Sequence, residues 1–268
     1  MKIAVVSKRN LGDNALKNWL LDGIKSSGEF DVVELESASG ISQEFDRVLV
    51  FGGDGTMLDA VRYSVPFDIP VLGVNLGYLG FLTDFDNDVT TKELVAALKS
   101  TKFTEKSLLT VRVGGEERFA LNDLVVKSSS ARPIMMDLFV NGNFADTFKS
   151  DGLIVSTPTG STAYSLSAGG PIVAPDVKAI VVNPICPHSL HSRPIVVDDK
   201  AVIEVRLSGE EASLTVDGVV FKHVGANERV IVKSSQKTAK FVQTDKNNFF
   251  EKLLKKMNAW STTLQKTE

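Results

Sequence analysis

An aspartate stands in a glycine-rich turn near the start of the chain. The apolar run Val48–Phe51 is followed by Gly-Gly-Asp-Gly-Thr at residues 52–56 and then by helix-forming residues. A strand that runs through glycines into a helix N-terminus can bind an anion, because the backbone allows close approach, the amides point outward and the helix dipole favours negative charge. We therefore predict a phosphate-binding loop made of Gly52, Gly53, Gly55 and Thr56.

The carboxylate of Asp54 needs an explanation of its own, because it would repel a phosphate bound in the same loop. It can accept a proton from a substrate hydroxyl that attacks a phosphoryl group, or it can help to hold Mg²⁺. A third interpretation is a tight turn in which Asp54 bonds its own backbone. Two other phosphate motifs are excluded: the chain has no Gly-Lys pair for a P-loop, and Leu58 stands where a dinucleotide fingerprint needs its third glycine.

A second unusual stretch, Asp151–Ser165, reads as a buried strand followed by small and hydroxyl residues around Pro158 and Gly160. Hydroxyls and free amides gathered in this way suit sugar hydroxyls, a nucleobase edge or phosphate oxygens, and Tyr164 adds a ring for stacking. The alternative is a helix start with Ser161 or Thr162 as the N-cap. A cap needs one such residue rather than five, which favours a binding loop.

Three further clusters carry weaker signals. Asn122-Asp123 interrupts a strand-like run over residues 118–127 and can hold a ribose or an adenine amine, or can simply form a turn. Cys186, His188 and His191 have the ligand types of zinc but lack a fourth ligand, so we expect a rigid surface loop there. The last cluster is basic, and we expect it to be the solvated face of a helix: Lys252, Lys255 and Lys256.

The elements that must position these residues change in character along the chain. Up to about residue 100, strand-like runs alternate with helical spacing over residues 13–26 and 92–99, which predicts a mostly parallel sheet with helices on both faces. Residues 108–155 and 202–241 instead show short β-branched runs and glycine turns, typical of antiparallel strands. Residues 248–260 are helical again. We predict an α/β domain followed by a β-rich domain.

The composition of the 268-residue chain excludes several classes of protein. With 43% hydrophobic residues, 24% charged residues and a net charge of −3, it is globular and has no general field to hold nucleic acid. Its apolar runs are too short to cross a bilayer or to form a signal peptide. The single cysteine fits a reducing compartment, so we expect a cytoplasmic protein without membrane or nucleic-acid partners.

These motifs together resemble those of the NAD kinase family, whose members make NADP from NAD. Residues 51–56 are similar to the family's G-G-D-G-T motif, and residues 157–164 reproduce its T-P-T-G-S-T-A-Y stretch. Asn122-Asp123 stands where the family usually has Asn-Glu. Residues 75–82 and 184–190 match two further family segments, and the resemblance runs in order to about residue 220.

The resemblance implies a fold, an assembly and a set of site residues. The fold is an N-terminal α/β domain, residues 1–100, with a returning helix at 247–268, and a β-rich NAD-binding domain, residues 101–246. The assembly is a homodimer or homotetramer in which Lys149 approaches a neighbouring subunit's site. Asp54 is the general base on the adenosine ribose 2′-hydroxyl of NAD, and Mg²⁺ or another divalent cation accompanies ATP rather than binding side chains directly. The implied NAD contacts are Asp54, Gly55, Phe81, Asn122, Asp123, Lys149, Asp151, Thr159, Thr162, Ala163, Tyr164, Ser165 and Ser167.

Two positions depart from the family pattern, and two rival functions stay open. Asp123 is one methylene shorter than the usual Glu, and Val219 replaces a common Gln. A lipid or sphingoid kinase of the same superfamily shares the glycine motif, but the hydroxyl-rich loop suits a nucleoside better. A non-catalytic NADP-binding sensor is the other rival, and an intact Asp54 argues against it. The donor can be ATP, another nucleoside triphosphate or polyphosphate.

Overall fold

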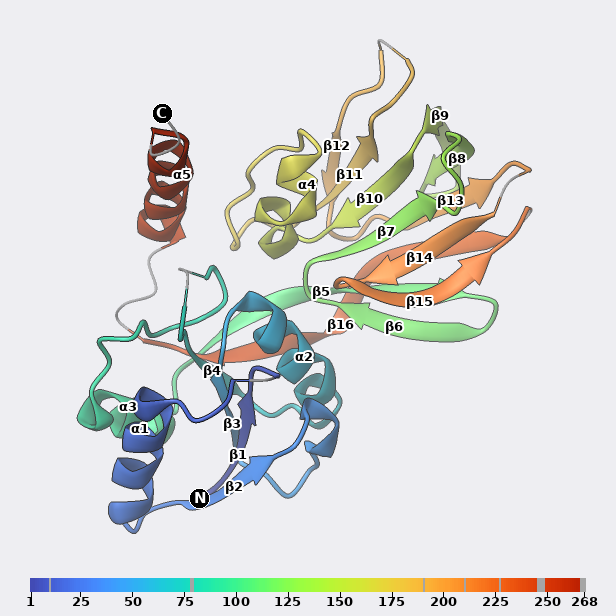
Figure 1. The fold of residues 1–268 in the computed structure, drawn as a ribbon. Helices are drawn as coiled ribbons and strands as arrows, with labels where there is room; N and C mark the ends of the chain where they lie inside the picture. Colours follow the sequence, from blue (N-terminus) through green and yellow to red (C-terminus); the bar gives the residue numbers. More distant parts are fainter. Residues whose placement is uncertain are drawn as a thin grey trace. The chain divides into compact units, whose positions relative to one another are not determined.

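The computed structural model describes residues 1–9, 11–77, 80–189, 191–209, 211–226, 228–244 and 249–265, with side chains of the last helix as far as residue 258 (Figure 1). The chain divides into two compact units, one of residues 1–105 and 239–268 and the other of residues 106–238. The predicted domains, 1–100 with 247–268 and 101–246, remain a prediction. No described helix is both long enough and apolar enough to cross a membrane.

Unit 1 is built on parallel strands. Strand β1 lies between β2 and β3, β3 pairs with β4, and the end of β16 joins β4 through Phe241 and Val71, all in parallel. Figure 1 shows α1 and α3 on one side of these strands and α2 on the other. The elements are β1 (Lys2–Ser7), α1 (Ala15–Ser26), β2 (Asp31–Leu35), η1 (Ala38–Gly40), β3 (Arg47–Phe51), α2 (Asp54–Ser64), η2 (Val65–Phe67), β4 (Val71–Val74), α3 (Thr91–Lys99) and α5 (Phe249–Gln265), with parts of β5 (Phe103–Val113) and β16 (Arg229–Val242).

The helices of unit 1 begin where local chemistry favours a start. Asn14 precedes α1 and its side chain accepts the Lys17 N–H at 3.0 Å. Thr90 and Glu93 form a reciprocal capping box at the start of α3. Leu20 and Ile24 are fully buried in α1, one turn apart, so the apolar stripe packs on the sheet. The predicted α/β class is confirmed.

Unit 2 is built on antiparallel strands. One group of strands runs in the order β12-β11-β10-β7-β14-β15, and the other runs β16-β13-β8-β9. Strands β13 and β14 alternate buried and half-buried residues, so each has one face in the apolar core. The elements are β6 (Glu116–Ala120), β7 (Asp123–Ser128), β8 (Ile134–Val140), β9 (Asn143–Ser150), β10 (Gly152–Ser156), η3 (Thr159–Thr162), α4 (Tyr164–Ser167), β11 (Ala179–Ile185), β12 (Ile195–Asp198), β13 (Ile203–Leu207), β14 (Ala212–Val216) and β15 (Val219–Val224), with the rest of β5 and β16.

The chain reaches unit 2 and leaves it through single long strands. Strand β5 begins in unit 1 and continues into unit 2, and β16 runs back from unit 2 into unit 1. Helix α5 then follows as part of unit 1, which confirms the predicted return of the C-terminal helix to the first domain. Its predicted first residue, Asn248, lies outside the described residues.

Candidate active site

The glycine turn lies at the N-terminus of α2. Strand β3 ends at Phe51, Gly53 is the N-cap, and Asp54 is the first residue of the helix. The first amides of a helix have no partner within the helix, so they are available to a ligand. A side chain at Gly53 or Gly55 would meet no atom within 4 Å, so there is room in front of those amides. The geometry fits the predicted anion-binding loop.

The Asp54 carboxylate is bonded to the backbone of a different loop, the one that follows β4. Its Oδ2 accepts the N–H of Phe81 at 3.0 Å, and its Oδ1 accepts the N–H of Leu82 at 2.9 Å. A Cβ at Gly80 would come closer than 3.0 Å to the same carboxylate, so glycine permits this approach. Oδ1 keeps one further lone pair, so Asp54 can still accept a proton there. Tyr78 and Leu79 of this loop lie outside the described residues.

The prediction that the lysines of α5 form a solvated face is wrong for two of them. Lys252 is 9% exposed and donates from Nζ to the Thr83 carbonyl at 2.6 Å. Lys256 Nζ lies 3.4 Å from Asp54 Oδ2 and 4.1 Å from the centroid of the Phe81 ring. Only Lys255 is exposed. Helical spacing does not say which face of α5 meets the protein, and here the face that carries Lys252 and Lys256 does.

The burial of Lys252 has an electrostatic consequence. Removal of the ammonium from water lowers the pKa of Lys252. The nearby carboxylates of Asp84, Asp86 and Asp54 raise the pKa of Lys252 and so offset part of this decrease. The loop after β4 is therefore rich in negative charge, and α5 places positive charge against it.

In unit 2, several hydroxyls of the predicted binding loop hold the loop itself. Thr157 Oγ1 donates to the Leu121 carbonyl at 2.6 Å and accepts the Gly160 N–H at 3.0 Å. Ser161 Oγ donates to the Pro158 carbonyl at 2.7 Å and is buried. Neither Ser161 nor Thr162 caps a helix, since both lie inside η3, so the capping alternative is wrong.

Other polar atoms, in this loop and in the neighbouring strand β11, are left for a ligand or water. In the part of the chain that the structure describes, the hydroxyls of Ser156 and Thr159 and the side-chain oxygen of Asn183 are buried without a hydrogen-bond partner. An unpaired buried polar atom is costly, so each calls for a partner that is not protein. Tyr164 is 39% exposed at the start of α4, and its ring is accessible for stacking.

Asn122 and Asp123 are fixed beside this loop by a hairpin. Asp217, with a φ of +47°, turns the chain from β14 to β15. Its Oδ1 accepts the Asn122 N–H at 2.7 Å and the Asp123 N–H at 3.2 Å. Asp123 is 5% exposed and pairs across the sheet with Ser156. Burial, together with the Asp217 carboxylate, raises the pKa of Asp123 to about 7, so this acid is partly protonated near neutral pH.

The structure thus gathers the predicted residues into separate groups. In unit 1, Asp54, its glycine turn and Phe81 are in contact. In unit 2 the second group surrounds the loop after β10: Asn122, Asp123, Thr159, Thr162, Ala163, Tyr164, Ser165 and Ser167. Asp151 precedes β10 whereas that loop follows it, so Asp151 lies roughly 17 Å away. Lys149 lies near the end of β9, two residues before Asp151, and is exposed.

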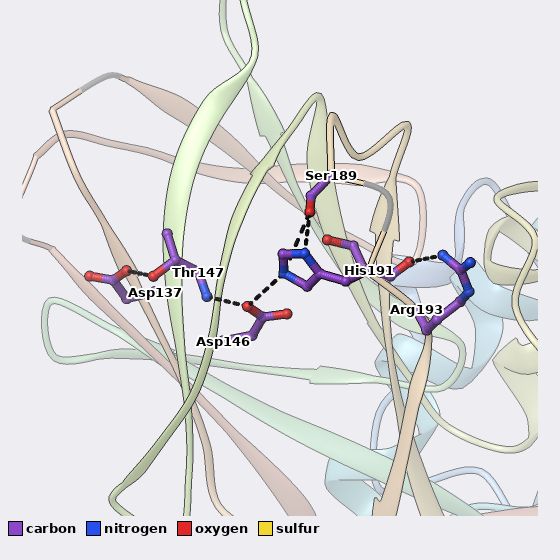
Figure 2. A network of polar contacts seen from close by, with 7 residues as sticks. Asp137, Asp146, Thr147, Ser189, His191 and Arg193 are labelled. Atoms are coloured by element: carbon purple, nitrogen blue, oxygen red, sulfur yellow. Dashed lines mark hydrogen bonds and ion pairs between the residues drawn. The ribbon is translucent and has the colours of Figure 1, made fainter.

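A polar network holds the segment after β11 against β9 (Figure 2). His188 N–H donates to the Lys149 carbonyl at 2.8 Å, and His191 Nε2 lies 3.7 Å from Asp146 Oδ1. Ser189 Oγ contacts His191 Nδ1 at 2.6 Å. This is the reverse of a hydrolase triad, in which the hydroxyl faces Nε2, and the imidazole is 73% exposed. The network therefore positions the loop beside Lys149. Leu190 lies outside the described residues.

The metal interpretation of this segment finds no support in its geometry. Cys186 is exposed with a φ of +45°, and His191 is directed to Ser189 and Asp146. Among the described residues, no three His, Cys, Asp or Glu side chains lie close enough together to bind a metal ion.

Comparison with known proteins decides the family. A family model described as the ATP-NAD kinase N-terminal domain matches residues 25–102, and one described as the ATP-NAD kinase C-terminal domain matches residues 121–244. The chain belongs to the NAD kinase family. A curated NAD kinase of Lachnoclostridium phytofermentans is 35% identical over 94% of this chain and 97% of its own length. Another, from Solibacter usitatus, is 42% identical over 81% of this chain and 79% of its own length.

Solved NAD kinases have the same fold. The structure of an NAD kinase from Archaeoglobus fulgidus in complex with ATP has a TM-score of 0.82 at 29% identity, and the match covers 94% of this chain and 98% of that one. Yeast NADH kinase complexed with NADH has a TM-score of 0.81 at 26% identity, over 94% of this chain and 86% of that one. Family membership makes the chain a phosphotransferase, and neither the lipid kinase nor the sensor is favoured.

Sequence reasoning missed the residues that approach the site from far along the chain. From α5, Lys252 contacts Thr83 in the loop after β4 and Lys256 contacts Asp54. From the β14–β15 hairpin, Asp217 binds the backbone of Asn122. In the sequence, Asp217-Gly218 reads only as one of the glycine turns expected within residues 202–241. A lysine pair spaced by four on one helix was the only available signal for α5, and it also fits a solvated face.

Proposed function

We propose that this protein transfers the terminal phosphoryl group of ATP to the 2′-hydroxyl of the adenosine ribose of NAD and so forms NADP. The observation that carries the proposal is the geometry of Asp54 in a chain of the NAD kinase family. Its carboxylate stands at an open helix N-terminus and is oriented by two backbone N–H groups. That arrangement combines a proton acceptor with an anion site, which is what phosphoryl transfer to a hydroxyl requires.

Asp54 acts as the general base in this proposal. The ribose hydroxyl is a weak nucleophile at neutral pH, and it becomes stronger as Asp54 accepts its proton. The Phe81 and Leu82 amides fix the carboxylate, so little reorientation is needed during the reaction. The N-terminal amides of α2, next to Gly53 and Gly55, bind phosphate oxygens of the donor.

A divalent cation enters with the donor. The described residues offer no cluster of carboxylates, histidines or cysteines that fits a resident metal, whereas triphosphate oxygens are good ligands for Mg²⁺. Bound to those oxygens, Mg²⁺ would supply neutralisation of the phosphate charge. The protein's own contribution is to position the hydroxyl, the base and the donor.

The hydroxyl-rich loop of unit 2 binds the adenosine part of NAD. The unpaired Thr159 hydroxyl and the exposed Tyr164 ring offer a polar contact and a stacking surface. Asn122 and Asp123 face the ribose and adenine, and Thr162, Ala163, Ser165 and Ser167 complete the contacts. Phe81 lies beside the adenosine. The predicted NAD-binding domain at residues 101–246 is part of this proposal.

Lys149 and Asp151 serve a neighbouring subunit. Both lie at the end of β10 away from the Thr159 loop, so one chain does not bring them to its own adenosine contacts. We accordingly propose a homodimer or homotetramer in which these residues complete the site of another copy. We also propose that the enzyme is cytoplasmic, as its single cysteine indicates.

A coupled assay tests the function. The purified protein is incubated with NAD, ATP and Mg²⁺, and NADP is detected with an NADP-specific dehydrogenase. We expect NADP to form, and parallel reactions with NADH and with polyphosphate define the acceptor and the donor. If no combination produces a phosphorylated dinucleotide while NADP binds tightly, the protein is a sensor.

The variant Asp54→Asn tests the base. We expect turnover to fall roughly 10²–10⁴-fold while the affinity for NAD stays within about one order of magnitude, because the amide keeps the shape but does not accept the proton. Asp59→Asn, the same substitution on the same helix, is the matched control and should retain activity. Near-normal turnover in Asp54→Asn would remove Asp54 from the role of base.

A further inference from the structure

The N-terminus of α2 combines two negative charges in the proposed reaction. Asp54 is the first residue of the helix, and the donor phosphates bind to amides of the same turn. The carboxylate and the phosphates would then lie within one helical turn of each other. Like charges that close repel each other strongly where water is partly excluded. The repulsion acts mainly on ATP, because its phosphates bind in the turn of Asp54 whereas NAD presents a hydroxyl to that carboxylate. A divalent cation on the donor offsets part of this repulsion, and a cation beside the carboxylate would offset more of it.

Lys256 is the cation best placed to offset it. Its Nζ lies 3.4 Å from Asp54 Oδ2, and both side chains are partly buried, with exposures of 21% and 32%. The ammonium also lies 4.1 Å from the centroid of the Phe81 ring, a cation–π distance. Phe81 in turn donates its N–H to Asp54. The ammonium, the ring and the carboxylate form one contiguous group.

Helix α5 holds Lys256 in this position through other contacts. One turn earlier, Lys252 Nζ donates to the Thr83 carbonyl at 2.6 Å, in the same loop. At the start of the helix the Phe249 ring lies 6.3 Å from the Phe81 ring. Residues four apart lie on one side of a helix, so Lys252 anchors the side that carries Lys256. Lys252 itself is directed to a carbonyl, and Lys255 is exposed.

We propose that Lys256 is a positioning residue of the phosphoryl-transfer reaction: it neutralises Asp54 so that the triphosphate donor can bind at the N-terminus of α2. Helix α5 thereby takes the place of the lysine that the glycine loop lacks, although it acts through Asp54 rather than on the phosphates. This inference rests on the proposed function, since it takes ATP as the donor. It predicts a defect in donor binding that NAD binding does not share.

Calorimetric titration with a non-hydrolysable ATP analogue and Mg²⁺ tests the inference without relying on catalysis. We expect Lys256→Met to weaken binding of the analogue about 10-fold, because a partly buried carboxylate is left uncompensated. NAD affinity should change less than about twofold. Lys256→Arg should restore most of the donor affinity, since it keeps the charge. Lys255→Met, on the exposed side of the same helix, should bind both ligands normally.

A double variant separates action through Asp54 from any other role of the lysine. In the Asp54→Asn background there is no carboxylate to neutralise, so adding Lys256→Met should change donor affinity less than about twofold. An equal loss in both backgrounds would overturn the proposal, as would an equal loss of NAD affinity. If Lys256→Met does not fold, Lys256→Gln gives the same comparison with a polar neutral side chain. A wild-type protein that binds the analogue but forms no NADP would refute the function while the titrations still decide the role of Lys256.

Discussion

At the scale of single residues, Asp123 links the free energy of unfolding to pH. Its pKa rises from 3.8 to about 7 on folding, because of burial and the Asp217 carboxylate. The folded protein therefore holds this proton more tightly than the unfolded chain. The resulting stabilisation is complete below about pH 4 and is lost as the pH rises to about 7, with an upper limit of ~4 kcal/mol.

The variant Asp123→Asn removes this proton and tests the linkage. We expect urea unfolding to show that the wild type loses stability between about pH 4 and about pH 8 by a few kcal/mol more than Asp123→Asn does. Asp176→Asn, at an exposed position of the same unit, is the control and should follow the wild type. Parallel pH curves for the wild type and Asp123→Asn would show that Asp123 titrates alike in both states.

Gly160 lies where the binding loop passes close to the Asn122 backbone. A Cβ there would come closer than 3.0 Å to the Asn122 carbonyl, and backbone atoms do not move aside cheaply. We expect Gly160→Ala to lower the free energy of unfolding by about 2 kcal/mol or more and to weaken NAD binding. Gly225→Ala, where the new methyl meets no atom within 4 Å, should stay within about 0.5 kcal/mol of the wild type. Chemical denaturation measures both variants. A Gly160→Ala variant as stable as Gly225→Ala would mean that the loop shifts to accept the methyl group.

The sequence singled out Asp54, Asn122 and the hydroxyl-rich loop because each breaks the pattern of its neighbourhood. It did not identify the partners of these residues. Lys256 is separated from Asp54 by 202 positions and Asp217 from Asn122 by 95, and such contacts exist only after the chain has folded. A lysine on an amphipathic helix also looks the same whether it faces water or a carboxylate.

At the scale of elements, α5 shows why amphipathic spacing alone misleads. Phe250, Leu254 and Met257 recur at helical spacing and are 66%, 61% and 46% exposed, whereas Lys252 is buried. The prediction of a solvated lysine face holds for Lys255 but not for Lys252 and Lys256, which contact the protein. Strands and helices of unit 1 were easier to predict, since alternating apolar runs and capping residues are local signals.

The Lys252 contact should control the local stability of the loop that carries Phe81 and Leu82. Replacement of the ammonium in Lys252→Met removes the hydrogen bond to Thr83 and leaves that carbonyl without its donor. We expect the amides of Phe81 and Leu82 to exchange with deuterium about 10-fold faster than in the wild type. Lys255→Met serves as the control and should leave exchange unchanged. Unaltered protection in Lys252→Met would mean that the Lys252 contact does not hold the loop.

At the scale of the whole molecule, the sequence changes from alternating strand-like and helical segments to short β-branched runs with glycine turns. This change was enough to predict two units of different class. Parallel strands with helices make the first, and antiparallel strands make the second. The long strand β16 was less predictable, because it pairs with β13 in one unit and with β4 in the other. Its sequence mixes β-branched residues with lysines and serines, and nothing local marks the change of partner.

The proposed assembly makes a prediction about mixed oligomers. If Asp54 and Asn122 of one chain share a site with Asp151 of another, then Asp54→Asn and Asp151→Asn should each inactivate every site of their own homo-oligomer. A heterodimer of the two variants keeps one intact site of its two, because the intact Asp54 then meets an intact Asp151. We expect such heterodimers, isolated with two different affinity tags, to recover about half of the wild-type activity.

A second pairing serves as the control for that experiment. Asp54→Asn combined with Asn122→Ala should recover no activity. Asp54 and Asn122 of one chain belong to the same site, so each of the two sites then contains one substituted residue. NADP formation by the isolated heterodimers is the measurement, and size-exclusion chromatography verifies that oligomers persist. Recovery in the first pairing alone requires a site completed by a neighbouring subunit. A first pairing as inactive as its parents would place Asp151 and Asp54 of one chain at the same site, and the exposed Lys149 beside Asp151 would then lose its proposed role in another copy.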